Sequence, residues 1–168
     1  MLYKKNKKSQ AWEIDLVIAV SIFLIGVLVF FIYSINQSVE SLEKLDIIFY
    51  KGKNVMDNIL SEGSPKDWNK DNVIRIGILD NGKINETKLE RFYNLTQENY
   101  FRTKIIFNTE YDYYFFFKNL TIGSSAIEGI GKPNTNLSNI NAENLVKISR
   151  VTIYKNEPKQ VYLYVWEE

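Results

Sequence analysis

Two acidic residues, Glu13 and Asp15, lie where the most apolar stretch of the sequence begins. An ionised carboxylate in an apolar phase costs several kcal/mol unless a positive group or hydrogen-bond donors compensate it. The two acids therefore either remain in water at an interface or pair with a cation. Basic charge is concentrated just before them, in Lys4, Lys5, Lys7 and Lys8. The chemistry that these residue types suggest is charge pairing at the edge of an apolar environment.

The residue types that carry out most catalysis are missing, because the sequence contains no cysteine and no histidine. Their absence excludes disulfides, thiolate metal sites and cysteine nucleophiles. It also removes the commonest general base and the commonest metal ligand. The net charge of +1 gives no reason to expect nucleic acid as a partner. We therefore expect no cofactor, no metal site and no catalytic residues, and we expect a chain that is not an enzyme.

Two stretches have a superficial similarity to ligand-binding motifs. The segment 123–133 is rich in glycine, but Ala126 stands where a phosphate-binding loop has its first glycine, and Pro133 stands where it has Ser or Thr. The aromatic residues at 111–117 and 162–166 could form a stacking platform, yet packing in the core of a small domain explains most of them. We expect neither stretch to bind a nucleotide or a nucleic acid.

The elements that would position Glu13 and Asp15 begin with a membrane segment. Residues 16–35, LVIAVSIFLIGVLVFFIYSI, carry no charge, and about 20 helical residues match the roughly 30 Å apolar core of a bilayer. A buried helix of a soluble domain would normally show a polar face. A cleaved secretory signal would have a shorter apolar region that ends in small residues. Because lysine-rich flanks stay in the cytoplasm, we expect a single-pass membrane protein whose remaining chain lies outside.

The sequence divides into four predicted segments. We expect a basic leader at 1–10, a transmembrane helix at 11–35, an amphipathic extension of that helix at 36–62 and an extracytoplasmic head at 63–168. In the extension, apolar residues recur seven apart and form one seam, with a kink or break expected at its glycine. The residues of the seam are Leu42, Leu45, Phe49, Gly52, Met56 and Ile59.

Strands are predicted in three parts of the head. Residues 72–79 and 111–118 have strand composition, and the first of these stretches is followed by a turn at 80–82. The C-terminal residues are predicted to form a hairpin around 156–158. Apolar residues alternate along its two strands, namely Val151, Ile153, Val161, Leu163 and Val165.

Two short helices are predicted between these strands. Asn85 is a suitable N-cap for a helix at 86–95, and a second helix is expected at 96–107. The predicted fold class is therefore α+β. A long transmembrane and amphipathic helix at the N-terminus is followed by a small antiparallel β-rich head with short helices.

The N-terminal layout resembles archaeal type IV pilin-like proteins with class III signal peptides. Precursors of that family have a short basic leader, a small residue before the cleaved bond, often Gln after it, and an early acid. Here the leader is MLYKKNKKS, in which Ser9 replaces the usual glycine, and Gln10 follows. The family commonly has a glutamate as the fifth residue of the mature chain. Cleavage after Ser9 puts Ile14 at that position, whereas cleavage after Gln10 puts Asp15 there. The specific similarity covers residues 1–35.

The resemblance implies a structural subunit whose leader is removed by a prepilin-type signal peptidase at Ser9, Gln10 or Ala11. It also implies assembly through the N-terminal helix, with copies of itself or other pilin-like subunits, into a surface filament or pseudopilus. One acid, with Asp15 favoured over Glu13, would then neutralise a free amino terminus; the alternative is that both acids simply stay in water. The alternative function is that of an uncleaved, signal-anchored cell-surface protein whose head binds a partner.

Five N-x-Ser/Thr sequences occur in the chain, all on the predicted outer side of the membrane. Such sequences accept N-linked glycans in domains outside the cytoplasm. Asn36 lies too close to the predicted membrane to be a good acceptor. The remaining candidates are Asn136, Asn119, Asn94 and Asn85, of which Asn136 is favoured because it lies in a predicted loop.

Overall fold

The computed structural model of the chain describes residues 7–123 and 125–167, with the side chains of residue 12, of 14–35 and of residues from 42 onward. The chain forms two compact units, Met1–Glu43 and Lys44–Glu168. We call the second unit the head. The expected amphipathic extension, 36–62, is therefore divided between the two units.

Helix α1, Lys7–Ile59, supplies residues to both units. It ends close to residue 62, the predicted end of the extension, but it begins before residue 11, the predicted start of the transmembrane helix. A later segment of the chain holds the last turn of the helix. The amide of Ile78 donates to the carbonyl of Ile59 at 2.8 Å. This bond satisfies a carbonyl that a helix end leaves without an intrahelical partner.

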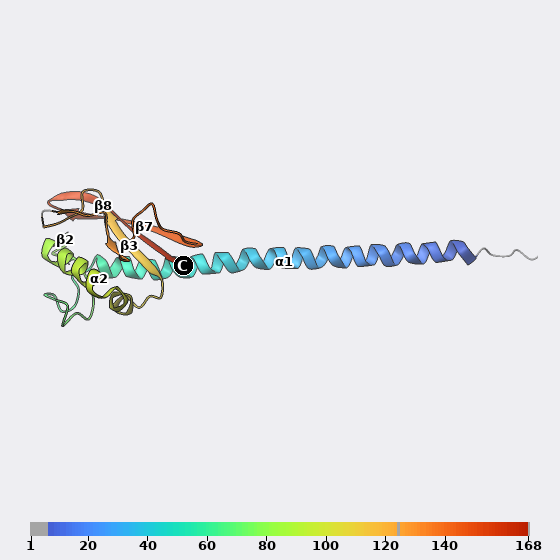
Figure 1. Ribbon diagram of the computed structural model, residues 1–168, viewed down its shortest axis with the longest axis horizontal. Coiled ribbons are helices and arrows are strands. Elements are labelled where there is room, and N and C mark those ends of the chain that lie inside the picture. The colour runs from blue at the N-terminus through green and yellow to red at the C-terminus, as the bar shows by residue number, and fades with distance from the viewer. Residues whose placement is uncertain (1–6, 124, 168) are drawn as a thin grey trace, which may run out of the picture. The chain divides into compact units, whose positions relative to one another are not determined.

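The head is built on a predominantly antiparallel sheet (Figure 1). A six-stranded sheet has the order β1-β2-β7-β8-β3-β6, and a separate two-stranded sheet pairs β4 with β5. Strands β7, β8 and β3 form the antiparallel centre, and β2 joins β7 in parallel. The class is α+β, as predicted. The strands are β1 Leu79–Asp80, β2 Lys83–Ile84, β3 Asp112–Phe117, β4 Thr121–Ile122, β5 Ser125–Ala126, β6 Ile130–Gly131, β7 Asn144–Tyr154 and β8 Glu157–Glu167.

The part of α1 that belongs to the head packs on the inner face of this sheet at Gly52. A Cβ atom at that position would lie 2.7 Å from Cδ1 of Ile148 and 2.9 Å from Cγ2 of Val165. Gly52 therefore permits a close approach of helix and sheet. The predicted kink at this glycine is wrong, since the helix continues through it to Ile59.

The predicted seam of α1 is correct only at its C-terminal end. Gly52 and Met56 are buried, whereas Leu42 and Phe49 are exposed. The buried stripe follows helical spacing toward the sheet and consists of Ile48, Gly52, Val55, Met56 and Ile59. The seven-residue repeat predicted a seam without Ile48 and Val55. The face of the helix that the sheet covers includes both of these residues.

Helix α2, Glu86–Phe107, begins as the sequence predicts. The side-chain oxygen of Asn85 accepts a hydrogen bond from the amide of Lys88 at 3.1 Å, which is the bond of an N-cap. The two predicted helices form one element with a kink at Asn99. The side chain of Asn99 accepts from the amide of Arg102 at 2.9 Å and so caps the second half of the helix from within.

Residues 72–79, predicted as a strand, form a mainly irregular segment around Trp68. Only Leu79 belongs to β1, and Arg75 makes an isolated bridge to Ser64. Trp68 is fully buried, and its Nε1 donates to the carbonyl of Gly77 at 2.8 Å. The backbone of this segment thus bonds to Trp68 and to residues 59–64, and only its last residue joins the sheet.

The hairpin β7–β8 turns at Lys155 and Asn156, which have φ values of 51° and 61°. Two consecutive positive φ values match the twist of a two-residue hairpin loop. The predicted position of this turn, 156–158, is displaced, because Pro158 lies inside β8 opposite Ile153.

The predicted alternation is correct for β8 and wrong for β7. Val151 and Ile153 of β7 are exposed, the former at 71%. Tyr154 is buried instead, and its ring meets that of Phe117 edge-on with centroids 5.2 Å apart. Because successive side chains of a strand point to opposite faces, burial of Tyr154 turns Val151 and Ile153 outward. The buried residues of β8 are Val161, Leu163, Val165 and Trp166.

Candidate functional site

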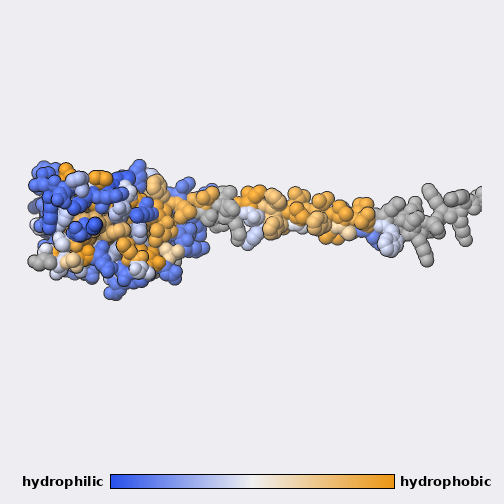
Figure 2. Space-filling model, turned by 90° about the horizontal axis from the view of Figure 1, so that it is seen from above, coloured by the Kyte–Doolittle hydropathy of each residue, from blue (hydrophilic) through white to orange (hydrophobic). Residues whose placement is uncertain are grey.

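The segment Ile14–Ile35 of α1 is long and apolar enough to cross a membrane. Its mean hydropathy is 3.0, and none of it is buried within the described structure. Figure 2 shows its surface as predominantly hydrophobic, in contrast to the surface of the head, where hydrophilic and hydrophobic residues are mixed. Large contiguous apolar surfaces are rare on soluble monomers and mark contacts with lipid or protein. This segment is therefore the first candidate for a functional surface.

The residues predicted at the processing site lie in the first turns of α1. The backbone is helical at Ser9, Gln10 and Ala11, but their side chains and that of Glu13 fall outside the described residues. Asp15 is exposed at the start of the apolar segment. Two residues correspond to about 200° of rotation around a helix, so Glu13 and Asp15 lie on nearly opposite faces. A neighbour on one side can therefore meet only one of the two acids.

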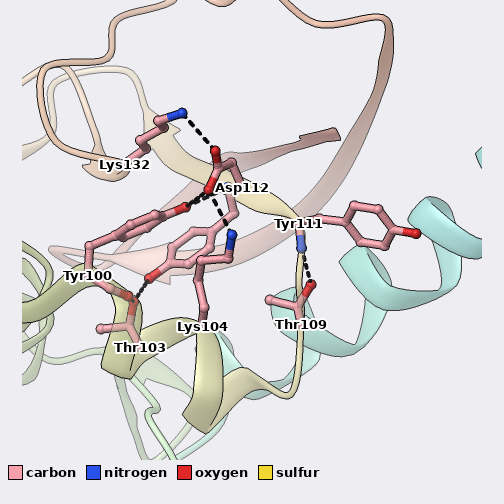
Figure 3. Close-up of polar contacts among 8 residues, drawn as sticks. Tyr100, Thr103, Lys104, Thr109, Tyr111, Asp112 and Lys132 are labelled. Carbon is pink, nitrogen blue, oxygen red and sulfur yellow. Dashed lines mark hydrogen bonds and ion pairs between the residues drawn. The ribbon is translucent and has the colours of Figure 1, made fainter. Parts of the chain in front are cut away.

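A second cluster surrounds Asp112 at the beginning of β3 (Figure 3). Its Oδ1 accepts from Nζ of Lys104 at 3.0 Å and from the hydroxyl of Tyr100 at 3.1 Å. Its Oδ2 accepts from Nζ of Lys132 at 2.8 Å. The carboxylate thus joins α2, β3 and the chain that follows β6.

The cluster continues inward through hydroxyl groups. Tyr100 accepts at its hydroxyl from the amide of Tyr113 at 3.0 Å, and the hydroxyls of Thr103 and Tyr113 are also hydrogen-bonded to each other. Figure 3 shows Tyr100, Lys104 and Lys132 converging on Asp112, with Thr103 beside Tyr100. They tie the buried end of the aromatic strand to the helix that covers it.

The electrostatics of the cluster favour a fixed ion pair over proton transfer. Burial alone would raise the pKa of Asp112, but hydrogen bonds from Lys132 and Lys104 outweigh it and hold the pKa below its ordinary value. Burial raises the pKa of Tyr100 and Tyr113 far above the ordinary phenol value. Near neutral pH the carboxylate is therefore ionised and both phenols remain protonated, so the cluster holds elements of the fold together.

A groove of about 470 Å³ lies at the N-terminal end of α2 and contains several cations. The ammonium of Lys88 donates to the carbonyls of Glu62 and Leu79, each at 2.8 Å. Arg91 donates to the carbonyl of Trp68 at 2.6 Å. These donors fasten the 60–80 segment to α2, so the positive charges of the groove serve the fold.

Lys66, on the rim of the same groove, makes an ion pair with Asp80 at 3.0 Å. The contact with Lys66 holds the pKa of Asp80 below the ordinary value. Lys66 also lies 3.6 Å from a carboxylate oxygen of Glu62. The cations of the groove that are described here therefore all have protein partners.

The aromatic residues on the outer face of the sheet pack mainly on one another. The ring of Phe116 stacks on that of Tyr162 and meets that of Tyr164 edge-on, both with centroids 5.2 Å apart. The ammonium of Lys147 lies 4.5 Å from the centroid of Tyr162. Ring faces that are already used in this way do not form the open platform that stacking of a sugar or base would need.

Across the described residues, no cluster of three or more acidic side chains could hold a metal ion. Among the glycosylation candidates, Asn85 caps α2 and Asn94 lies inside it. Asn119 is in the turn between β3 and β4, and Asn136 is in the loop between β6 and β7. The structure does not bring these four asparagines together into one site.

Sequence reasoning missed the Asp112 cluster and the buried Lys88. A signal was present in the first case, because Asp112 is the only charged residue in the aromatic run 111–117. A charge at the start of a buried strand needs partners. Nothing in the local sequence identifies those partners, since Lys104 and Lys132 come from other elements.

Comparison of the chain with protein-family models, curated proteins and solved structures finds no match. Function must therefore be argued from the chain's own residues. The exposed apolar segment Ile14–Ile35, with Asp15 near its start, is a feature that the described part of the fold leaves uncovered.

Proposed function

We propose that this chain is a membrane-anchored, pilin-like structural subunit. A prepilin-type peptidase removes its leader, and the N-terminal helix then assembles into a surface filament or pseudopilus. The observation that carries the proposal is the apolar surface of Ile14–Ile35, exposed on the same helix whose C-terminal part forms the core of the head. One helix thus offers an apolar surface for lipid or sister helices and also supports a folded domain.

The proposed location follows from charge. The lysines of the leader keep the N-terminus in the cytoplasm, and the head lies on the outer side of a single membrane span. In this state lipid covers the apolar segment. In the assembled state the same surface packs against sister helices or other pilin-like subunits, and the role of the chain is assembly instead of catalysis.

The helical backbone of the first turns supports a role for the acids. Cleavage after Ser9 would create an amino terminus at Gln10, three residues before Glu13. Cleavage after Gln10 would create it at Ala11, four residues before Asp15. Residues three or four apart share a helical face, and the backbone is helical here. Each acid therefore lies one turn from one of the two candidate termini.

Pairing of the free α-amino group with Glu13 or Asp15 would leave no net charge in the apolar environment. An α-amino group has an ordinary pKa of about 8 and is mainly protonated at neutral pH. A carboxylate beside it would compensate a charge that otherwise costs several kcal/mol in an apolar phase. The neutralised pair could then enter a packed helical core, within one chain or between neighbours, and would fix the axial position of a subunit.

The test is to determine the N-terminus of the chain purified from membranes. We expect it at Gln10 or Ala11, and we expect Ser9→Phe to leave the leader attached. The bond that is cleaved then selects the matched pair of variants. A terminus at Ala11 predicts that Asp15→Asn impairs assembly more than Glu13→Gln, and a terminus at Gln10 predicts the reverse. An intact N-terminus at Met1 would support the uncleaved, signal-anchored binding protein instead.

A further inference from the structure

The loop between β6 and β7 holds one N-x-Ser/Thr sequence, Asn136-Leu137-Ser138, in a defined turn. The side-chain oxygen of Asn136 accepts from the amide of Ser138 at 2.9 Å and from that of Asn139 at 3.0 Å. The side chain of Asn139 in return accepts from the amide of Asn136 at 2.7 Å. An asparagine that accepts from the amide two residues ahead forms an Asx turn.

This turn presents the two groups that define the sequence motif. Because Oδ1 of Asn136 is fixed on the backbone, Nδ2 on the other side of the amide carbon is directed away from the turn. Among the described residues, neither Nδ2 of Asn136 nor the hydroxyl of Ser138 has a hydrogen-bond partner, and Ser138 is exposed. The hydroxyl of Ser138 is thus open to an approaching enzyme, and Asn136 beside it is partly exposed.

The sequences at Asn85 and Asn94 are used by helix α2. The side-chain oxygen of Asn85 is the N-cap and accepts from Lys88, three residues ahead, instead of from Thr87. Asn94 is exposed, but the hydroxyl of Thr96 is fully buried and donates to the carbonyl of Tyr93 at 2.6 Å. At Asn94 the hydroxyl is therefore inaccessible, and at Asn85 the amide belongs to a helix cap instead of an Asx turn.

The sequence at Asn119 is the strongest competitor, because Asn119 is exposed in a turn. Its hydroxyl residue, Thr121, is paired with Ala126 in β4. The hydroxyl of Thr121 also lies 3.2 Å from the hydroxyl of Tyr154. The strand pairing and this contact hold Thr121 in the fold, whereas Ser138 is free of both.

We propose that Asn136 is the N-glycosylation acceptor of this chain, with a lipid-linked oligosaccharide as the sugar donor. The inference rests on the outer location of the head in the proposed function. Nδ2 of Asn136 forms a bond to the anomeric carbon of the first sugar as the bond from that carbon to the lipid phosphate breaks. The phosphate leaves with the bonding electron pair, and one Nδ2 proton passes to solvent. The product keeps one N–H and the Oδ1 acceptor of the turn.

The test uses the full chain purified from membranes of its native host. Cleavage after glutamate releases the peptide 129–143, in which Asn136 is the only N-x-Ser/Thr asparagine, and separates it from Asn119. We expect mass spectrometry to find the added mass of an oligosaccharide on this peptide. Asn136→Gln and Ser138→Ala should abolish it, Ser138→Thr should keep it, and the matched control Asn119→Gln should leave it unchanged.

Three results would overturn the inference: an unmodified 129–143 peptide in the native chain, an added mass that survives Ser138→Ala, or a glycan found only at another asparagine. The N-terminus measured in the same sample separates this inference from the proposed function. A processed N-terminus with an unmodified loop removes the glycosylation inference alone. A glycosylated loop with Met1 still present removes the pilin-like function and leaves the modification.

Discussion

Helix α1 contains two regions whose apolar residues have opposite surroundings. In Ile14–Ile35 every described side chain is exposed, whereas in the head the same helix buries Ile48, Val55 and Met56 completely. The sheet covers the second region, and within the described structure nothing covers the first. A helix that belongs to the fold in one part and leaves an apolar surface in another needs an outside apolar partner there. This contrast is the physical basis of the proposed anchoring and assembly.

The largest expected effect comes from a charge in the middle of the apolar segment. Leu24→Arg places a cation where the proposed partner is lipid, at a cost of about 3 kcal/mol, or roughly 100-fold in partitioning. Fractionation should show a loss of the chain from membranes, with a head that still folds. Ile48→Arg is the matched change in the buried region, and it should unfold the head while leaving membrane association intact. The comparison fails if both variants have the same phenotype.

The two glycines of α1 provide the next test. Gly52→Leu would force a side chain between the helix and the sheet, where even Cβ would lie 2.7 Å from Ile148. We expect a loss of about 2–3 kcal/mol in the free energy of unfolding, since overpacking outweighs the gain in helix propensity. Urea unfolding of the detergent-solubilised chain, followed by circular dichroism, measures it.

Gly26→Leu is the control, because a Cβ placed there meets no atom within 4 Å other than those of the adjacent residues and the helix's own backbone. It should leave the unfolding of the head unchanged. A stable Gly52→Leu variant would show that the helix and the sheet do not approach as closely as described.

The sequence predicts the apolar segment and the helix cap better than it predicts the strands of the head. The apolar segment was predicted almost to its ends, because length and composition alone define it. The cap at Asn85 was also predicted, since its partner Lys88 is three residues away. The strand expected at 72–79 was wrong because the backbone of this segment bonds to Trp68 and to residues 59–64, which local patterns do not identify as partners. The prediction of which β7 side chains point inward was wrong, because Val151 and Tyr154 are both good strand residues. Only packing against Phe117 decides which of them is buried.

The Asp112 cluster depends on residues that local patterns cannot bring together, and its removal is expected to cost less. Asp112→Asn should lower the free energy of unfolding by about 2 kcal/mol at neutral pH, because Lys104 and Lys132 lose their charged acceptor. The folded-state pKa of Asp112 lies below its unfolded value. The contribution of Asp112 to the free energy of unfolding is therefore complete above about pH 4 and is lost as the pH falls through the folded-state pKa.

The variant should accordingly show a flatter loss of stability in acid than the wild-type chain. Urea midpoints measured from about pH 2 to about pH 7, a range that includes carboxyl titration, would reveal this difference. Parallel curves for Asp112→Asn and wild type would mean that the ion pairs do not stabilise the head.

The smallest expected effect concerns the start of α2. Asn85→Ala removes the acceptor of the Lys88 amide and should cost about 1 kcal/mol in the stability of the head. Asn85→Asp retains a side-chain acceptor and should recover most of the loss. A shift of the urea midpoint measures both variants, and equal midpoints for Ala and Asp would contradict the capping role.

The most direct test of the proposed function is to shear material from the surface of native cells and examine it by electron microscopy and N-terminal sequencing. The proposal predicts filaments that contain this chain, each copy beginning at Gln10 or Ala11. A chain that stays entirely in the membrane fraction, with Met1 at its N-terminus, would contradict it.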